Sequence, residues 1–422
     1  MFRKLLSLEE AREVLKRSLS PKPAGEEQVP LSEAHGRVLA EDVTAPIDVP
    51  PFNRSTVDGY AVRATDTFGA EEDRPVALEF CGRIAIGEPP RVVVKNHMTA
   101  EIVTGAPLPE GADAVVMLEY AVREDNTIFI QRAVSRGENV MRAGSDIRKG
   151  ETILRRRQRI SSREIGVLAA LGTTQVAVYK RPKVAVISTG AEIVDPGDPL
   201  SPGKIYDINA STLSAAVREC GGDPVNLGII LDDLDQLKSA LKKALKMADM
   251  TVTSGGVSVG PKDVIPQVLN TLGKPGVIVS GIAVKPGKPT TIAMIDGKPV
   301  FSLPGHPTSA LLMFYQLVRP LIYRMTGTRE KASPMVKAFA EKRMFPARGR
   351  RTFTMVKLAR DKSGRLLASP VALGLSGAIT TLAKADGFVM ISEEQQFIDA
   401  GDEVSVWLFK PEIDSEKGAL RS

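Results

Sequence analysis

The sequence is poor in cysteine and in aromatic residues. Cys81 and Cys220 are its only cysteines, so we expect no disulfide framework and predict two small buried thiols in a reducing compartment. There are 13 Phe, 6 Tyr and 1 Trp, and no basic segment is interleaved with them as a stacking platform for nucleic acid requires. We therefore predict no nucleic-acid partner.

Long apolar runs are also missing. No stretch approaches the roughly 18 to 20 apolar residues that span a bilayer. The N-terminal segment MFRKLLSLEEAREVLKRSL carries acidic residues throughout, unlike a signal peptide. We therefore expect a cytoplasmic protein without a membrane partner. With 56 Lys and Arg against 50 Asp and Glu, the net charge of +6 favours an anionic partner only weakly.

The first half of the chain is predicted to be a helix followed by β structure. At 422 residues the chain is long enough for about two to four domains. Ser7 and Glu10 form a capping box for an N-terminal helix, and a short helix is predicted over residues 30–40. Between residues 52 and 139 the runs VALEFCG, RVVVKNH, AVVMLEY and TIFIQ alternate with turn residues and predict a small barrel or sandwich. Ser161 or Ser162 caps the next helix.

From residue 182 strands alternate with helices, which predicts a parallel sheet with helices on both faces. Asp207 or Asn209 is the expected cap of one of these helices. Ligands of such folds bind beyond the carboxyl ends of the strands, where Thr189-Gly190, Asp232, Ser254-Gly255-Gly256 and Pro304-Gly305 fall. After residue 327 a basic stretch leads into TFTMVKLA, GFVMIS and EVSVWLF, which predict a second β domain.

The segment MTVTSGGVSVGPKD, residues 250–263, combines a strand, a glycine-rich loop and the start of a helix. Glycines let the backbone approach a ligand closely, and a helix N-terminus offers unpaired N–H groups to an anion. A phosphate site is one interpretation, and an ordinary turn that needs glycine is the other. Two further glycine turns, KPGKP and LPGHP, follow within about one βαβ unit and favour the phosphate site.

Eight motifs carry a resemblance to a known family. They are PPFNRSTVDGYAVRA (50–64), EIVTGAPLPEGADAVVMLE (101–119), ENVMRAGSDIRKGE (138–151), STGAEIVDPG (188–197), IYDINASTL (205–213), TSGGVSVGPKD (253–263), KPGKPT (285–290) and SLPGHPTSALLMFYQLVRP (302–320). In this order they resemble the molybdopterin molybdenumtransferases, the bacterial MoeA group together with the E domain of gephyrin. The resemblance covers nearly the whole chain.

The resemblance implies a multidomain α/β plus β fold. Residues 1–23 would form a helix packed on a MogA-like, doubly wound α/β/α domain at 178–327. A small mixed domain would comprise 24–45 and 146–177, with a β domain inserted at 46–145 and a C-terminal β-barrel at 328–422.

The implied activity is insertion of molybdate into adenylylated molybdopterin with release of AMP, by a Mg²⁺-dependent transferase. The family also implies a homodimer whose subunits share the active cleft, with a molybdopterin adenylyltransferase as upstream partner. Two alternatives stay open: the chain is itself such an adenylyltransferase, or it is a non-catalytic cofactor carrier or scaffold.

Carried over by motif, the implied site has three groups of residues. The catalytic residues would be Glu192, Asp263, Asp58, Thr104 and Asp146, and the metal ligands Glu192, Asp232 and Asp263. The substrate would contact Ser254, Gly255, Gly256, Ser258, Lys285, Lys288, Pro304, Pro307, Arg350 and Ser376.

Most of these residues also have a purely structural explanation. An acid such as Asp263 is favoured at any helix N-terminus, and Asp58 before a glycine is an ordinary turn residue. A basic side chain such as Arg350 is usually solvated. His306, which replaces a common Asn of the family, is better explained by retained size and hydrogen bonding than by catalysis. Glu192 has the weakest structural explanation, because it follows a strand-end glycine at the expected ligand edge.

Overall fold

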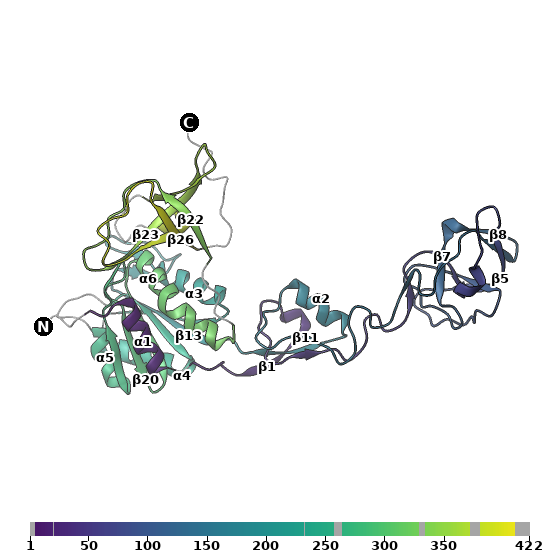
Figure 1. Ribbon diagram of the computed structural model, residues 1–422. Helices are drawn as coiled ribbons and strands as arrows, with labels where there is room; N and C mark the ends of the chain where they lie inside the picture. Colours follow the sequence, from purple (N-terminus) through teal and green to yellow (C-terminus); the bar gives the residue numbers. More distant parts are fainter. Residues whose placement is uncertain are drawn as a thin grey trace. The chain divides into compact units, whose positions relative to one another are not determined.

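The computed structural model describes residues 5–19, 21–231, 233–256, 264–328, 334–371 and 380–409 (Figure 1). Its contacts divide the chain into two compact units. Unit 1 comprises Met1–Glu27, Gly36–Val38 and Val178–Ser422, and unit 2 comprises Gln28–His35 and Leu39–Ala177. The finer domain boundaries implied by the family resemblance stay predictions.

The main sheet of unit 1 has the strand order β16-β13-β17-β21-β20-β18. The bounds are β13 Lys183–Thr189, β16 Asp223–Ile230, β17 Met250–Ser254, β18 Pro275–Ser280, β20 Thr291–Ile295 and β21 Lys298–Leu303. Strands β16, β13, β17 and β21 run parallel, as predicted.

Two further strands, β20 and β18, were not predicted: β20 pairs antiparallel with β21, and β18 pairs antiparallel with β20. The cause lies in the sequence. Asp296 and Gly297 join β20 to β21 with φ values of 48° and 84°, and two consecutive residues with positive φ form the tight turn of a β-hairpin.

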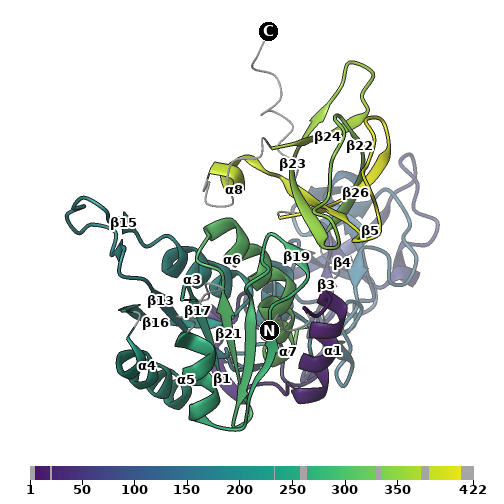
Figure 2. The ribbon, with the colours of Figure 1, turned by 90° about the vertical axis from the view of Figure 1, so that its left-hand side faces the viewer.

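Helices cover both faces of this sheet, as predicted. One face carries α1 (Leu8–Ser18), α3 (Asn209–Glu219) and the continuous segment of α6 (Pro307–Met313), a π-helical turn (Phe314–Val318) and α7 (Arg319–Met325). The other face carries α4 (Leu234–Met247) and α5 (Val264–Leu272) (Figure 2).

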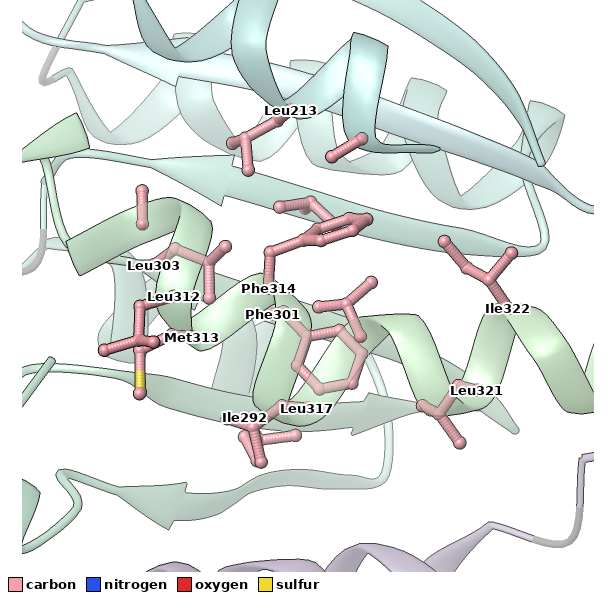
Figure 3. Close-up of a cluster of buried hydrophobic side chains, with 14 of the residues drawn as sticks. Leu213, Ile292, Phe301, Leu303, Leu312, Met313, Phe314, Leu317, Leu321 and Ile322 are labelled. Atoms are coloured by element: carbon pink, nitrogen blue, oxygen red, sulfur yellow. The ribbon is translucent and has the colours of Figure 1, made fainter. Parts of the chain in front are cut away.

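The first face holds the largest core, in which Phe301 of β21 and Phe314 lie fully buried beside Leu213 of α3 (Figure 3). Helix α1 joins this core through Leu8, Ala11 and Leu15. Its predicted capping box is confirmed: the Glu10 amide donates to Ser7 Oγ at 3.1 Å, and the Ser7 amide donates to the Glu10 carboxylate at 2.7 Å.

The C-terminal strands close into the predicted barrel. They are β22 (Met335–Ala340), β23 (Arg351–Arg360), β24 (Leu366–Pro370), β25 (Gly387–Ile391) and β26 (Glu403–Leu408). Their order is β23-β24-β22-β26-β25, and β25 pairs back with β23. A short strand, β19 (Val284–Lys285), pairs parallel with β23 and so joins the KPGKP loop to the barrel.

Unit 2 contains the predicted β module as a sheet of order β7-β4-β6-β5-β9-β8. The bounds are β4 Gly59–Val62, β5 Val76–Ile84, β6 Met98–Ile102, β7 Ala114–Met117, β8 Ala121–Glu124 and β9 Thr127–Ile130. The strand predicted from RVVVKNH is wrong. That segment makes only an isolated bridge at Val93, between Pro89-Pro90 and the left-handed His97.

The helix predicted over residues 30–40 is likewise reduced to one 3₁₀ turn, Leu31–Glu33, before Gly36 takes a φ of 76°. The predicted helix α2 (Ser162–Ala170) is confirmed with Ser161 as its cap. The remaining short elements are β1 Glu26–Pro30, β2 Val43–Thr44, β3 Arg54–Ser55, η2 Ala64–Thr67, η3 Leu118–Tyr120, β10 Val140–Met141, β11 Thr152–Leu154, β12 Gln175–Tyr179 and α8 Thr380–Lys384.

Across the described ranges, none of the helices combines the length and apolarity that a membrane crossing needs.

Candidate active site

The candidate site of unit 1 lies where β13, β17 and β21 end. Asn209, the first residue of α3, connects two of these strand ends: its Nδ2 donates to Ser254 Oγ at 2.6 Å and to the Gly305 carbonyl oxygen at 2.7 Å. Ser254 Oγ in turn donates to the Pro304 carbonyl oxygen at 3.2 Å. The structure thus brings together Ser254 and Pro304, which the sequence predicted separately.

The two glycines after β17 are required by close packing. Gly255 and Gly256 have φ values of 94° and 65°. A Cβ on Gly255 would lie 2.2 Å from the backbone oxygen of Thr189, and one on Gly256 would lie 2.8 Å from Thr189 Oγ1. The Gly255 amide donates to the Leu303 carbonyl oxygen at 3.2 Å, so this N–H is engaged within the sheet and is not free for an anion.

Glu192 follows three residues after the end of β13. It precedes β14 (Ile193–Val194), which pairs parallel with β15 (Ile205–Tyr206), and the Ile205 amide donates to its carbonyl oxygen at 2.9 Å. Its exposed carboxylate oxygens lie 2.7 and 2.8 Å from the point that a Cβ on Gly190 would occupy. A larger residue at Gly190 would therefore displace the Glu192 carboxylate from this position.

Five deeply buried side-chain oxygens at this edge have no hydrogen-bonding partner in the described part of the chain. They are Ser188 Oγ and Thr189 Oγ1 at the end of β13, Asp207 Oδ2 and Asn209 Oδ1 at the start of α3, and Thr308 Oγ1 in the first turn of α6. Buried polar atoms in native proteins are nearly always paired, so such a cluster needs an explanation.

The predicted basic residues approach each other through the β19 to β23 pairing. Lys285 lies opposite Thr352, and Arg350 immediately precedes β23. Arg351 is engaged by two carboxylates, those of Glu9 and Glu393, so its charge is already compensated. Lys285 is exposed, and Lys288 and Arg350 are half-buried. Pro307 is buried as the first residue of α6.

In unit 2 the side chain of Asp58 contacts Thr104, and both are predicted site residues. The Thr104 amide and hydroxyl donate to the same Asp58 oxygen at 2.7 and 2.9 Å. These two bonds, the amide first, lower the pKa of Asp58 below its ordinary value of 3.8. Asp146 is exposed beside the bridge between Val49 and Ile147, and no contact with Asp58 or Thr104 is found among the described residues.

Four predicted site residues, Asp232, Ser258, Asp263 and Ser376, lie outside the described residues. Within the residues that are described, no group of three or more His, Cys, Asp or Glu side chains could hold a metal ion. Of the predicted metal ligands, Glu192 is the one whose position is known.

Sequence reasoning missed the part played by Asp207 and Asn209, which it treated only as alternative helix caps. The N-cap of α3 is Ile208, so neither residue is the cap, but Asp207 Oδ1 accepts from the Ala210 amide in the first turn at 3.0 Å. Asn209 instead joins two strand ends. The available signal was the motif IYDINASTL, which places two polar side chains after a short strand at the ligand edge.

Comparison with known proteins adds an independent line of observation. Three family profiles match in order: "MoeA N-terminal region (domain I and II)" over residues 6–172, "Probable molybdopterin binding domain" over 185–324 and "MoeA C-terminal region (domain IV)" over 337–409. A molybdopterin molybdenumtransferase of Bacillus subtilis is 36% identical over 394 residues, which cover 92% of this chain and 91% of that protein.

A second relative of the same name, from Haemophilus influenzae, is 34% identical over 404 residues, which cover 95% of this chain and 98% of that protein. Two crystal structures of molybdopterin biosynthesis MoeA proteins from Pyrococcus horikoshii match with TM-scores of 0.84 and 0.78, at 44% and 30% identity. Each covers 96% of this chain and 100% of the matched chain.

The Asp58 and Thr104 contact can be tested by titration. Thr104→Val removes the hydroxyl donor and keeps the amide donor, so the pKa of Asp58 should rise towards 3.8 without reaching it. NMR of the carboxyl carbons in protein labelled on aspartate measures this pKa. Thr56→Val, two residues before Asp58, is the control and should leave it unchanged. An unaltered pKa in Thr104→Val would show that the hydroxyl contact does not form in solution.

Proposed function

The chain belongs to the MoeA family of molybdopterin molybdenumtransferases, and on that premise we propose that it inserts molybdate into adenylylated molybdopterin and releases AMP. The observation that carries this proposal is the junction of strand ends around Asn209, which gathers the glycine turns of β17 and β21 at one edge of the sheet. Ligands of parallel α/β sheets bind at this edge.

The substrate's charge suits the residues around the junction. Adenylylated molybdopterin carries a pyrophosphate, and Lys285, Lys288 and Arg350 supply positive charge from the KPGKP loop and the barrel. In the reaction the P–O–P bond breaks and AMP leaves. An oxygen of water or of molybdate forms the new P–O bond. Molybdate is inserted when the two thiols of molybdopterin form Mo–S bonds, and one molybdate oxygen leaves with their two protons as water. Fixed cations stabilise the charge that develops on the phosphate oxygens.

We further propose that Glu192 is a ligand of Mg²⁺, together with Asp232 and Asp263. A hard cation binds carboxylate oxygens, and Mg²⁺ commonly uses one or two carboxylates, with waters and substrate phosphates completing its shell. The exposed carboxylate of Glu192, above the end of β13, fits this requirement. When bound, Mg²⁺ would neutralise charge on the pyrophosphate.

The two alternative functions are not favoured. The molybdenumtransferase relatives align over more than nine-tenths of the chain, and the MoeA C-terminal profile matches residues 337–409. An adenylyltransferase would consume ATP in the presence of molybdopterin. A carrier would retain the finished cofactor without turnover.

We propose a cytoplasmic homodimer that receives its substrate from a molybdopterin adenylyltransferase. A two-fold symmetric dimer is the commonest assembly of a soluble protein, and the family resemblance implies an active cleft shared between subunits. Asp58 and Thr104 would then act on substrate held by the partner subunit. A content of two cysteines, Cys81 and Cys220, suits a reducing compartment.

The activity is tested by AMP release. Full-length protein given adenylylated molybdopterin, Mg²⁺ and molybdate should release AMP, measured by chromatography, and the rate should fall when EDTA removes Mg²⁺. Glu192→Gln should lower the rate on the order of a hundredfold, because a charged ligand becomes a neutral one. The exposed Glu394→Gln is the matched control and should keep the full rate. Equal rates with and without molybdate would rule out the proposed activity.

The shared cleft is tested by mixing inactive subunits. Glu192→Gln and Asp58→Asn homodimers should each be nearly inactive. After denaturation and refolding together, half of the dimers are mixed and each contains one intact site, so activity should recover to about a quarter of the natural value. No recovery, with mixed dimers present by native mass spectrometry, would place Glu192 and Asp58 in a site within one subunit.

A further inference from the structure

We propose that Asp207 and Asn209 form a hydrogen-bond acceptor subsite that binds the N–H edge of an amino-bearing heterocycle of the substrate. This inference rests on the proposed function and assigns a part of the substrate to residues for which sequence reasoning gave only a capping role.

The first observation is the buried carboxylate of Asp207. The residue is 3% exposed, and its Oδ1 accepts from the Ala210 amide at 3.0 Å. Its Oδ2 is buried without a partner among the described residues. An unpaired carboxylate oxygen in a protein interior costs folding free energy, and a bound donor would offset that cost.

The second observation is the orientation of the Asn209 amide. The Gly305 carbonyl oxygen can only accept a hydrogen bond, so the amide nitrogen of Asn209 must face it. The amide oxygen is therefore an acceptor, and it too is buried without a partner in the described ranges. The Asn209 side chain is 9% exposed, and its two hydrogen bonds to Ser254 and Gly305 fix the amide group.

The position of Asp207 joins it to the rest of the site. The Asp207 amide donates to the Val194 carbonyl oxygen at 2.8 Å. Val194 belongs to β14, which begins directly after Glu192. Asp207 and Asn209 are separated by one residue at the start of α3. Both free oxygens thus belong to the edge that the glycine turns and Glu192 also form.

Two hydrogen-bond acceptors require a ligand group that donates hydrogen bonds. Phosphate oxygens are acceptors themselves, so the pyrophosphate must bind elsewhere, near the cations Lys285 and Lys288. The N–H donors of adenylylated molybdopterin lie on its two heterocycles, the pterin and the adenine. Either can present an amino group to a carboxylate and an amide oxygen.

Asp207→Asn is the informative change, because it reverses the hydrogen-bonding character of one atom only. The Asn oxygen can still accept from the Ala210 amide, while an NH₂ donor replaces the oxygen that has no partner. A donor ligand would then meet a donor. The contact with the Ala210 amide is retained, so the melting temperature of the unliganded protein should stay about the same.

The experiment is calorimetric titration of the full-length protein with AMP, with inosine monophosphate and with a 6-substituted pterin that lacks phosphate. If the adenine uses the subsite, AMP should bind the natural protein more tightly than inosine monophosphate, and Asp207→Asn should weaken AMP about tenfold or more and remove that preference. If the pterin uses it, Asp207→Asn should weaken the pterin by a similar factor and leave both nucleotides unchanged.

Three results would overturn the proposal. The first is equal affinity of the natural protein and the Asp207→Asn variant for every probe, and the second is no binding of any probe by the natural protein. The third is a loss of affinity in the variant that appears only when Mg²⁺ is present, which would assign the two oxygens to a cation. The titrations need no turnover. Binding that responds to Asp207→Asn in a protein without molybdate-dependent AMP release would therefore separate a failure of the proposed function from a failure of the subsite.

Discussion

One buried amide organises the candidate site. The Asn209 side-chain amide donates one hydrogen bond to Ser254 at the end of β17 and one to Gly305 after β21. It thereby fixes two glycine turns that are about 50 residues apart in the sequence. Close packing of Gly255 and Gly256 against Thr189 adds the end of β13 to the same junction. A rigid edge of this kind suits a site that must hold a substrate in one geometry.

The cations reach this edge through a different constraint. Two residues of β19 pair with the barrel strand β23, and this pairing brings the KPGKP loop beside Arg350. The Arg351 side chain in the same barrel strand forms ion pairs with Glu9 of α1 and with Glu393, and the first of these links the strand to the N-terminal helix. The position of Lys285 therefore depends on the barrel as well as on the sheet.

The sequence predicted individual helices and strands better than it predicted which of them pack together. Capping signals predicted α1 and α2 because these signals are local, and the alternation of strands and helices predicted the parallel part of the sheet. The hairpin at Asp296-Gly297 was not predicted, although an Asp-Gly pair is a local signal for a tight turn. The contact of Asn209 with Gly305, and the alignment of Lys285 with β23, depend on which distant segments meet, and no short pattern encodes that. The family resemblance implied Asp58 and Thr104 as separate site residues, and the structure shows the hydrogen bonds that join them.

We propose that this sheet edge binds adenylylated molybdopterin, with its heterocycle and its pyrophosphate held by different groups. The decisive test is a crystal structure of the protein with that substrate bound. We expect pyrophosphate oxygens near Lys285 and Gly256, and an N–H edge of one heterocycle within hydrogen-bonding distance of Asp207 Oδ2 and Asn209 Oδ1. A substrate bound away from the carboxyl ends of β13, β17 and β21 would contradict it.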